Sequence, residues 1–495
     1  MQDFIKINKD DNVAVALKPI AKGTTVNVAG TDVTTLEDVP QGHKFAIKPI
    51  KKGDAVIKYG FRIGYAQADV EVGGWIHTHN LKTALGELLD YTYNPEGHKD
   101  VEPTDEAYFE GYMRENGKVG VRNEVWIIPT VGCVNSIARA IEATARLNKP
   151  EGVDEVVAFT HPYGCSQTTE DQENTRTVLA DLINHPNAGA VLVLGLGCEN
   201  SRIEVLKNYI GEVNPDRVKF LQVQDVEDEQ EAAAEIMEEL MNYAAAFKRE
   251  KVSAKELVIG MKCGGSDGLS GITANPTVGL FSDMLVSKGG TTILTEVPEM
   301  FGAETILMDR CANRELFDKT VCLINDFKEY FIKNGQEIYE NPSPGNKDGG
   351  ITTLEDKSLG CTQKSGSSLV KGVLAYGERV QNKGLNLLSA PGNDLVASTA
   401  CAAAGAQIVL FTTGRGTPFA SPVPTVKIAT NSRLAGRKGN WIDFNAGRLV
   451  TDDVPMEQLA DELFRLVLDV ASGRKVKAEL AGFHDLAIFK QGVTL

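Results

Sequence analysis

The chain has 495 residues, of which 42% are hydrophobic and 24% are charged, and its net charge is −16 at pH 7. This length predicts about three domains, and the hydrophobic share excludes a disordered, collagen-like or coiled-coil protein. An acidic chain with no apolar run of about 18 residues and no apolar segment at residues 1–9 is expected to have no nucleic-acid partner, no transmembrane helix and no signal peptide.

The first 90 residues are predicted to form a small all-β module. Short alternating and β-branched runs recur there every 8–12 residues and are separated by turns rich in Lys and Gly. From 91 to 110 the chain is rich in Pro, Gly and acidic residues without periodicity, which is typical of a linker.

The rest of the chain alternates apolar strands with helical patterns, as parallel α/β sheets do. We expect a Rossmann-like α/β domain over 111–252 and a larger α/β domain over 253–495. The second of these contains a long polar segment at 341–368, which has the composition of a functional loop.

Four of the eight cysteines follow predicted strands, where α/β sheets bind ligands: Cys133, Cys165, Cys198 and Cys263. A thiol at the start of a helix ionises more easily and can then ligate a metal, although Cys also simply fits tight turns beside Gly. Cys322 and Cys401 are expected in helical core instead. No CxxC pair or disulfide framework is present, which is typical of the reducing cytoplasm.

The segment WIHTHN contains two histidines, His77 and His79. On a strand, side chains two residues apart point to one face, so these imidazoles could bind one divalent cation. They could equally be exposed or hydrogen-bonded strand residues. A third ligand cannot be identified from spacing, and His161, Cys165, Cys198 and Glu199 are the candidates.

Anion-binding groups follow other predicted strands. GLGCEN, with Gly195 and Gly197, is a near miss to a dinucleotide fingerprint because Asn200 replaces the last small residue. The same geometry could bind a carboxylate at the start of a helix. Arg415 lies between glycines after a strong strand and could grip a carboxylate through two hydrogen bonds, and Lys364 lies in the polar segment.

Several long segments occur in an order that identifies a family: IHTHN, GKVGVRNEVWIIPTVGCVN, HPYGCSQ, VLVLGLGCEN, CGGSDGLSGITANP, LTEVPEMFGAE, the 341–368 segment, LNLLSAPGND and FTTGRGTP. The chain resembles the altronate and galactarate dehydratases, a family that also contains the sulfolactate sulfo-lyases. The resemblance covers nearly the whole chain, and residues 77–80 are similar to the altronate branch.

The resemblance implies a β-clip (SAF-type) N-terminal module, a Rossmann-like middle domain and an α/β C-terminal domain. It also implies dehydration of D-altronate to 2-dehydro-3-deoxy-D-gluconate in cytoplasmic hexuronate catabolism, dependent on Fe²⁺ or Mn²⁺. The oligomeric state is left open, and a homo-oligomer is compatible with the sequence.

Dehydration beside a carboxylate needs an acid–base pair, an anchor for the carboxylate and a polarising cation. We therefore predict three groups of site residues: catalytic His161, Lys364 and Cys165; substrate-binding Arg415, Gly197, Asn200 and Asn80; metal-binding His77, His79, Cys198 and Glu199.

Three alternatives remain. The chain could act on galactarate or sulfolactate, and a sulfo-lyase would release sulfite. It could be a non-catalytic carbohydrate-binding protein built on the β-clip module. An iron–sulfur cluster on the strand-end cysteines is a less favoured variant of the metal site.

Overall fold

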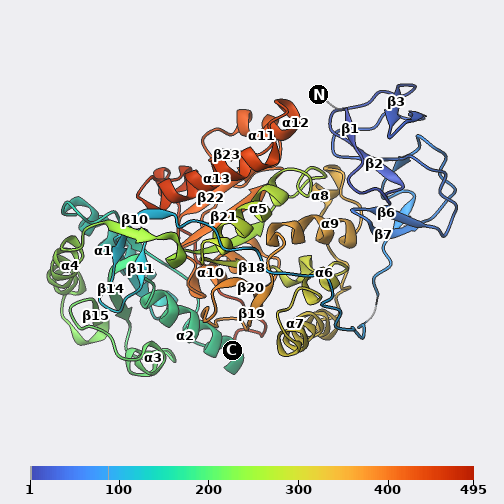
Figure 1. The fold of residues 1–495 in the computed structure, drawn as a ribbon. Coiled ribbons are helices and arrows are strands. Elements are labelled where there is room, and N and C mark those ends of the chain that lie inside the picture. The colour runs from blue at the N-terminus through green and yellow to red at the C-terminus, as the bar shows by residue number, and fades with distance from the viewer. Residues whose placement is uncertain (1–2, 87) are drawn as a thin grey trace.

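The computed structural model describes residues 3–86 and 88–495. An all-β N-terminal module and an α/β second domain lie at opposite ends of the molecule, with the large C-terminal α/β domain between them (Figure 1). The predicted α/β fold class with a small N-terminal all-β module is confirmed. Within the described residues, no helix is long and apolar enough to cross a membrane.

The N-terminal module is built from short antiparallel strands arranged in sheets of two to four. Alternate side chains of these strands face inward, as in the exposed–buried alternation of Thr25–Val28. Its strands are β1 (Phe4–Ile5), β2 (Val13–Ala16), β3 (Thr25–Val28), β4 (Thr31–Thr34), β5 (Lys44–Ala46), β6 (Ala55–Lys58), β7 (Phe61–Ala66), β8 (Trp75–Ile76) and β9 (Leu81–Lys82).

The segment after the module runs along the C-terminal domain. The Tyr91 hydroxyl donates to Glu304, the Tyr93 hydroxyl donates to the Cys311 carbonyl at 2.6 Å, and the Thr104 amide donates to the Ser287 carbonyl at 2.9 Å. The chain then enters a three-stranded sheet of β10 (Tyr108–Met113), β11 (Val119–Gly120) and β16 (Glu250–Ser253). The expected linker therefore lies against the C-terminal domain, although the second domain follows it in the chain.

The second domain has a parallel sheet with the strand order β13-β12-β14-β15. All eight residues of β14 are buried, as expected for a strand covered on both faces. The elements are β12 (Glu124–Pro129), η1 (Gly132–Val134), α1 (Asn135–Leu147), β13 (Val156–Ala158), α2 (Thr169–Ile183), β14 (Ala188–Gly195), α3 (Ile203–Ile210), β15 (Val218–Gln222), η2 (Val223–Asp225) and α4 (Glu229–Ala245).

The C-terminal domain is built on a seven-stranded parallel sheet with the order β19-β20-β18-β17-β21-β22-β23. Its strands are β17 (Val258–Cys263), β18 (Thr291–Leu294), β19 (Val370–Leu374), β20 (Gly384–Leu388), β21 (Ile408–Thr413), β22 (Thr425–Ala429) and β23 (Phe444–Asn445). Its helices are η3 (Ala254–Glu256), α5 (Ala274–Ser287), η4 (Val297–Glu299), α6 (Glu304–Met308), α7 (Arg314–Lys333), α8 (Pro344–Asp348), α9 (Leu354–Cys361), η5 (Thr362–Ser365), α10 (Asp394–Ala403), α11 (Ser432–Arg437), α12 (Arg448–Thr451), α13 (Met456–Ala471) and α14 (Lys477–Leu480).

The polar segment 341–368 differs from the loop that its composition suggested. It folds into α8, α9 and η5, and every residue of α9 is buried. Ser343 caps α8 and Thr353 caps α9 by accepting backbone hydrogen bonds. Asp356 and Lys357 of α9 are buried in ion pairs with Lys44, Lys58 and Glu299. The Glu355 carboxylate accepts hydrogen bonds from the Thr83 hydroxyl and the Ala84 amide.

The second and C-terminal domains share one hydrophobic cluster, to which Trp126 and Val191 contribute from one side and Leu388 and Ala400 from the other. Polar contacts join the same two domains, because Asn187 Nδ2 donates to the Gln407 carbonyl at 2.9 Å. The described part of the chain therefore holds these two sheets in a fixed relation through a common core.

Candidate active site

The carboxyl edge of the seven-stranded sheet carries the densest group of charged side chains. Cys263 ends β17, Glu296 follows β18, Asp394 follows β20 and Arg415 follows β21. Loops at this edge of a parallel sheet are where α/β proteins bind ligands.

Buried lysines and carboxylates meet below this edge. Lys262 Nζ lies 3.0 Å from Glu296 Oε1 and 2.7 Å from Asp394 Oδ1, and Lys357 Nζ lies 2.7 Å from Glu299 Oε1. Such charges are costly to bury and persist only when they are paired. A concentration of them at a ligand-binding edge points to a functional role.

Lys364 belongs to the same cluster, since its Nζ lies 3.6 Å from Glu296 Oε2. Glu296 adopts a left-handed backbone conformation with φ of 70°, which is strained for a residue with a Cβ. Burial and the neighbouring Glu299 raise the pKa of Glu296. Burial would also raise the pKa of Glu299, but Lys357 and Lys364 lower it to about 2.

A cavity of about 590 Å³ opens beside this cluster and is lined by four cations: Arg415, Arg433, Arg437 and Lys438. Within the described residues, none of the four has a carboxylate within salt-bridge distance. Trp441 forms an aromatic wall, and Asp267 and Asn431 add polar groups. Such a cavity suits an anionic, hydroxyl-rich small molecule.

The N-terminal module forms part of the same cavity through Gln41 and Gly42. Gly42, with φ of +81°, packs so closely that a Cβ there would lie 2.9 Å from the Gly349 carbonyl oxygen. Nearby, Lys44 Nζ and Lys58 Nζ bind the two oxygens of Asp356 at 2.8 and 2.9 Å. These contacts hold the module against the edge of the sheet.

Among the predicted site residues, Arg415 and Lys364 lie at this edge. The Arg415 side chain is exposed to the cavity, and its amide donates to the Gly265 carbonyl at 3.0 Å. Lys364 is buried, and burial lowers the pKa of its ammonium group. The surrounding thiols and carboxylates outweigh this effect and raise the pKa overall. An ammonium of this kind is suited to stabilising negative charge rather than to accepting a proton.

His77, His79 and Asn80 lie in the N-terminal module, but the expectation that the two histidines share a strand is wrong. Strand β8 ends at Ile76, and residues 77–80 form a turn. Asn80 closes this turn by accepting from the His77 amide at 3.0 Å and donating to the Trp75 carbonyl at 2.9 Å. The hydrogen bonds of the Asn80 side chain are therefore made within residues 75–80.

His77 is surrounded by aromatic rings. Its ring centroid lies 4.9 Å from that of His43 and 5.3 Å from that of Trp75. His77 Nδ1 is buried without a hydrogen-bond partner among the described residues. Burial and nearby Lys44 lower the pKa of His77 to about 4, so the ring is neutral near pH 7.

The remaining predicted residues lie at the carboxyl edge of the second-domain sheet. His161 is buried, its Nε2 lies 2.8 Å from the Pro129 carbonyl oxygen, and its Nδ1 accepts from the Tyr163 amide. Cys165 Sγ donates to Asn200 Oδ1 at 3.1 Å. Gly197 adopts a φ of +130°, which only glycine adopts readily.

Glu199 and Cys198 follow β14 in the same group. Glu199 accepts from the Thr130 hydroxyl and from the amides of Leu196 and Gly197, so its carboxylate braces its own loop. Cys198 is exposed. The second domain lies at the opposite end of the molecule from the module that holds His77 and His79 (Figure 1), so the structure does not bring His77, His79, Cys198 and Glu199 together as one ligand set.

The cysteines divide by exposure. Cys133, Cys165, Cys198 and Cys322 are exposed, whereas Cys263, Cys311, Cys361 and Cys401 are buried, and all eight are free. The expectation of helical core is met by Cys401 but is wrong for Cys322, which lies on the outer face of α7.

Sequence patterns missed Glu296, Glu299, Cys361 and Lys357 as site residues. Glu299 lies on η4 and Cys361 ends α9, 62 residues further along the chain. For Lys357 and Cys361, the available signal was the unusual polarity of segment 341–368, from which only Lys364 was selected as a site residue.

The donor atoms for a metal can be tested against the geometry. Cys263 Sγ, a Glu299 oxygen and Cys361 Sγ all lie within 4.8 Å of one another, and no other group of three or more such residues meets this criterion in the described chain. Two thiols and a carboxylate are a donor set that fits a divalent transition metal such as Fe²⁺. They fit Mn²⁺ less well, because that ion prefers oxygen ligands.

Comparisons with known proteins agree with this architecture. Three family models match: "Altronate/galactarate dehydratase SAF domain" over residues 2–84, "D-galactarate dehydratase/Altronate hydrolase, second domain" over 111–245, and "D-galactarate/Altronate dehydratase, C-terminal" over 254–494.

Three curated relatives illustrate the range of the family. The altronate dehydratase of Bacillus subtilis (strain 168) is 55% identical over the full length of both chains. The galactarate dehydratase (L-threo-forming) of Escherichia coli (strain K12) is 35% identical over 98% of this chain and 96% of its own. The (2R)-sulfolactate sulfo-lyase subunit beta of Chromohalobacter salexigens is 30% identical over 77% of this chain and 96% of its own. The chain belongs to the altronate/galactarate dehydratase family.

Proposed function

We propose that the chain is a hydro-lyase that removes water from D-altronate and yields 2-dehydro-3-deoxy-D-gluconate. The 55% identity to an altronate dehydratase over the full length of both chains supports this substrate over galactarate, whose dehydratase is 35% identical. The structural observation that carries the proposal is the cavity of about 590 Å³, whose four lining cations have no carboxylate within salt-bridge distance in the described part of the chain.

The substrate fits this cavity by charge. The overall charge of −16 opposes the approach of an anion, so affinity must come from short-range contacts with fixed cations. Arg415 is placed to hold the substrate carboxylate through two parallel hydrogen bonds. Gln41, which comes from the N-terminal module, can bind a hydroxyl group, whereas the Asn431 side chain already bonds Asp267 and caps α11.

The reaction removes the C2 proton beside the carboxylate and expels the C3 hydroxyl, after which the enol product tautomerises to the 2-keto acid. The charge that develops on the carboxylate needs stabilisation by fixed positive groups. Arg415 supplies such charge from the wall of the cavity, and Lys364 lies buried at the same edge of the sheet without lining the cavity. His161 and Cys165 remain predictions for proton transfer. Both lie at the carboxyl edge of the second-domain sheet, outside the lining of this cavity, and both ring nitrogens of His161 are hydrogen-bonded.

We also propose that activity requires Fe²⁺; the alternative, Mn²⁺, fits the two thiols and one carboxylate less well. A bound cation polarises the substrate oxygens as a Lewis acid. The free state of all eight cysteines supports a reducing cytoplasm as the setting. Hexuronate catabolism is proposed as the pathway from the substrate alone.

A substrate panel tests the proposal. Anaerobically prepared chain supplied with Fe²⁺ is incubated with D-altronate, galactarate or sulfolactate, and 2-keto acid and sulfite are measured. We expect 2-keto acid from D-altronate at a kcat/KM well above that for galactarate, and no sulfite. Sulfite release, a preference for galactarate, or binding of D-altronate without turnover would each contradict the proposal.

A further inference from the structure

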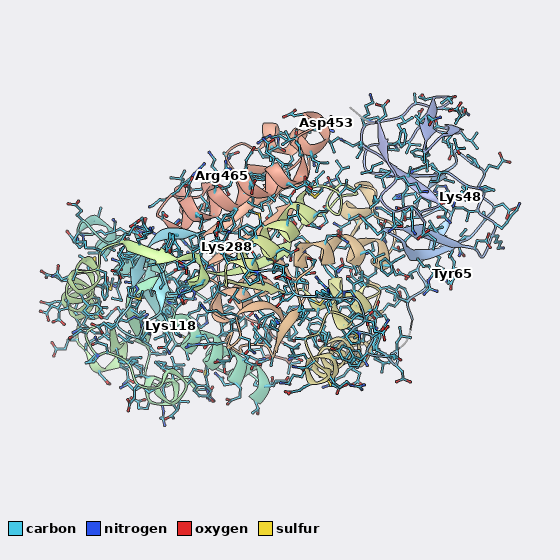
Figure 2. All side chains as sticks on the ribbon, viewed as in Figure 1. Lys48, Tyr65, Lys118, Lys288, Asp453 and Arg465 are labelled. Carbon is cyan, nitrogen blue, oxygen red and sulfur yellow. The ribbon has the colours of Figure 1, made fainter. Side chains whose placement is uncertain are left out.

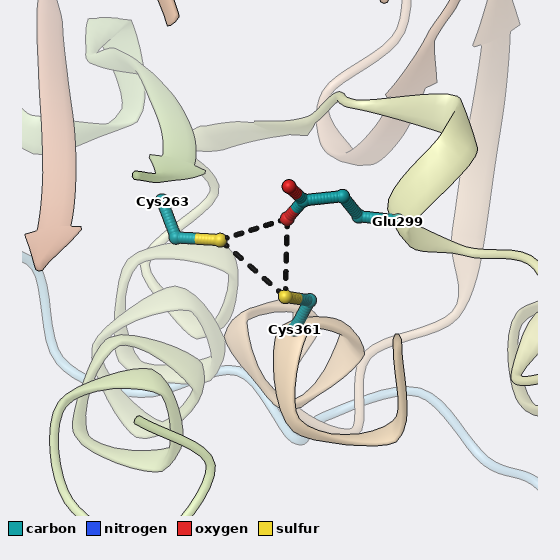
Figure 3. Close-up of side chains that lie close together, drawn as sticks. All are labelled: Cys263, Glu299 and Cys361. Atoms are coloured by element: carbon teal, nitrogen blue, oxygen red, sulfur yellow. Dashed lines mark hydrogen bonds between the residues drawn. The ribbon is translucent and has the colours of Figure 1, made fainter. Parts of the chain in front are cut away.

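Two buried thiols and a carboxylate converge below the cationic cavity. Cys263 Sγ and Cys361 Sγ donate to the same oxygen, Glu299 Oε2, at 3.0 and 3.1 Å, and the two sulfur atoms lie 3.4 Å apart (Figure 3). The three side chains come from the end of β17, from η4 and from the end of α9. Packing alone does not require such a convergence, since a buried thiol is satisfied by a single acceptor.

The spacing of the donors is close to that of a metal site. Metal–sulfur bonds of about 2.3 Å in a tetrahedral arrangement place two sulfur atoms about 3.8 Å apart. The sulfur atoms therefore need to separate by about 0.4 Å to admit an ion at that geometry. Glu299 is already oriented for this role, because Lys357 Nζ holds its other oxygen at 2.7 Å.

The surrounding charges also allow a cation. Lys262, Lys357 and Lys364 balance Glu296, Glu299 and Asp394, so the cluster is neutral while both thiols keep their protons. When a divalent ion binds, two S–H bonds break, two metal–sulfur bonds form and two protons leave to solvent. The charge of the buried cluster is then unchanged, and the lysines are no obstacle to binding.

We propose that Cys263, Glu299 and Cys361 bind one divalent transition metal through two thiolates and one carboxylate, and that this site selects iron, zinc or cobalt over manganese and magnesium. The inference rests on the metal dependence within the proposed function and assigns its ligands. Thiolates favour the softer ions, whereas Mg²⁺ and Mn²⁺ prefer oxygen.

Three protein ligands leave a coordination position open, as in catalytic rather than structural sites. A cavity of about 10 Å³ borders Cys361 and Lys357, which is the room needed for about one water molecule. Asp267 lines both this small cavity and the cationic one, so the metal site and the substrate cavity are neighbours.

Cobalt titration of the full-length, metal-depleted chain under anaerobic conditions tests the inference without substrate. We expect one Co²⁺ per chain and the intense near-ultraviolet absorption of thiolate-to-cobalt charge transfer. Zn²⁺ should displace the cobalt, and Mg²⁺ or Mn²⁺ at the same concentration should not. Cys263→Ser and Cys361→Ser should each weaken binding by more than the 10- to 100-fold typical of losing an outer-shell partner.

Cys311→Ser is the matched control, because Cys311 is a buried thiol of the same domain whose Sγ contacts Thr320 Oγ1 at 3.3 Å. It should leave the band and the affinity unchanged. Circular dichroism shows whether the variants are folded, and the spectrum of the unmodified chain decides the question if one of them is not. Cobalt bound without the thiolate band, or a band that survives in the Cys263→Ser/Cys361→Ser double variant, would overturn the assignment.

The two proposals fail in different ways. A chain that shows the cobalt–thiolate band but does not dehydrate D-altronate overturns the proposed function and supports the metal site. A chain that dehydrates D-altronate but shows no band overturns the metal site alone.

Discussion

Asp356 is the residue on which the contact between the N-terminal module and the C-terminal domain depends most. It is 2% exposed and pairs with two fully buried lysines of the module, Lys44 and Lys58. Removing one member of a buried charge group leaves the others without compensation. Asp356→Asn should therefore lower the free energy of unfolding by about 3–5 kcal/mol, measured by urea denaturation at pH 7.

The same residue predicts the direction of a pH dependence. Burial would raise the pKa of Asp356, but Lys44 and Lys58 hold it well below its usual range. The stabilisation is then present above about pH 4 and is lost as the pH falls through the lowered pKa. The exposed pair of Lys51 and Asp69 gives the control, and Asp69→Asn should change stability little. If Asp356→Asn and Asp69→Asn lowered the free energy of unfolding equally, the buried charge group would stabilise the fold no more than an exposed ion pair does.

At the scale of elements, local patterns predicted what depends on local sequence. Strand–helix alternation placed Cys263 and Arg415 at strand ends, and the structure puts both at one edge of the sheet. The turn at 77–80 was missed because WIHTHN has strand-like alternation, and only the Asn80 side chain ends the strand.

Helix α9 was missed for a different reason. Its sequence is polar, and its charges are buried because Lys44 and Lys58 of the N-terminal module pair with Asp356. Lys357 of the same helix pairs with Glu299. Long-range pairing of this kind has no signature in a single sequence. The convergence of Cys263, Glu299 and Cys361 is invisible for the same reason, since each comes from a different element.

At the scale of the whole molecule, the N-terminal module is predicted to complete the substrate site. A chain covering 91–495 keeps every strand from β10 to β23 but leaves Asp356 without Lys44 and Lys58, so it should be less stable than the full chain, and circular dichroism shows whether it is folded. It lacks Gln41 and Gly42 of the cavity, so we expect no turnover of D-altronate. Adding separately produced residues 1–90 should restore activity. Full activity of 91–495 alone would place the complete site in the later domains.

The most direct measurement is the steady-state kinetics of Arg415→Lys on D-altronate. A charge-assisted bidentate contact is worth about 1.5–3 kcal/mol and an ammonium cannot reproduce its fork, so kcat/KM should fall by on the order of tenfold or more. A rise in KM alone would mean that Arg415 binds the substrate and the transition state equally well. A fall in kcat would mean that Arg415 stabilises the charge that develops in the transition state. Arg465→Lys, on the exposed face of α13 (Figure 2), is the matched control and should leave kcat/KM unchanged. An unchanged kcat/KM for Arg415→Lys and also for Arg415→Ala would contradict binding of the substrate carboxylate in the cationic cavity.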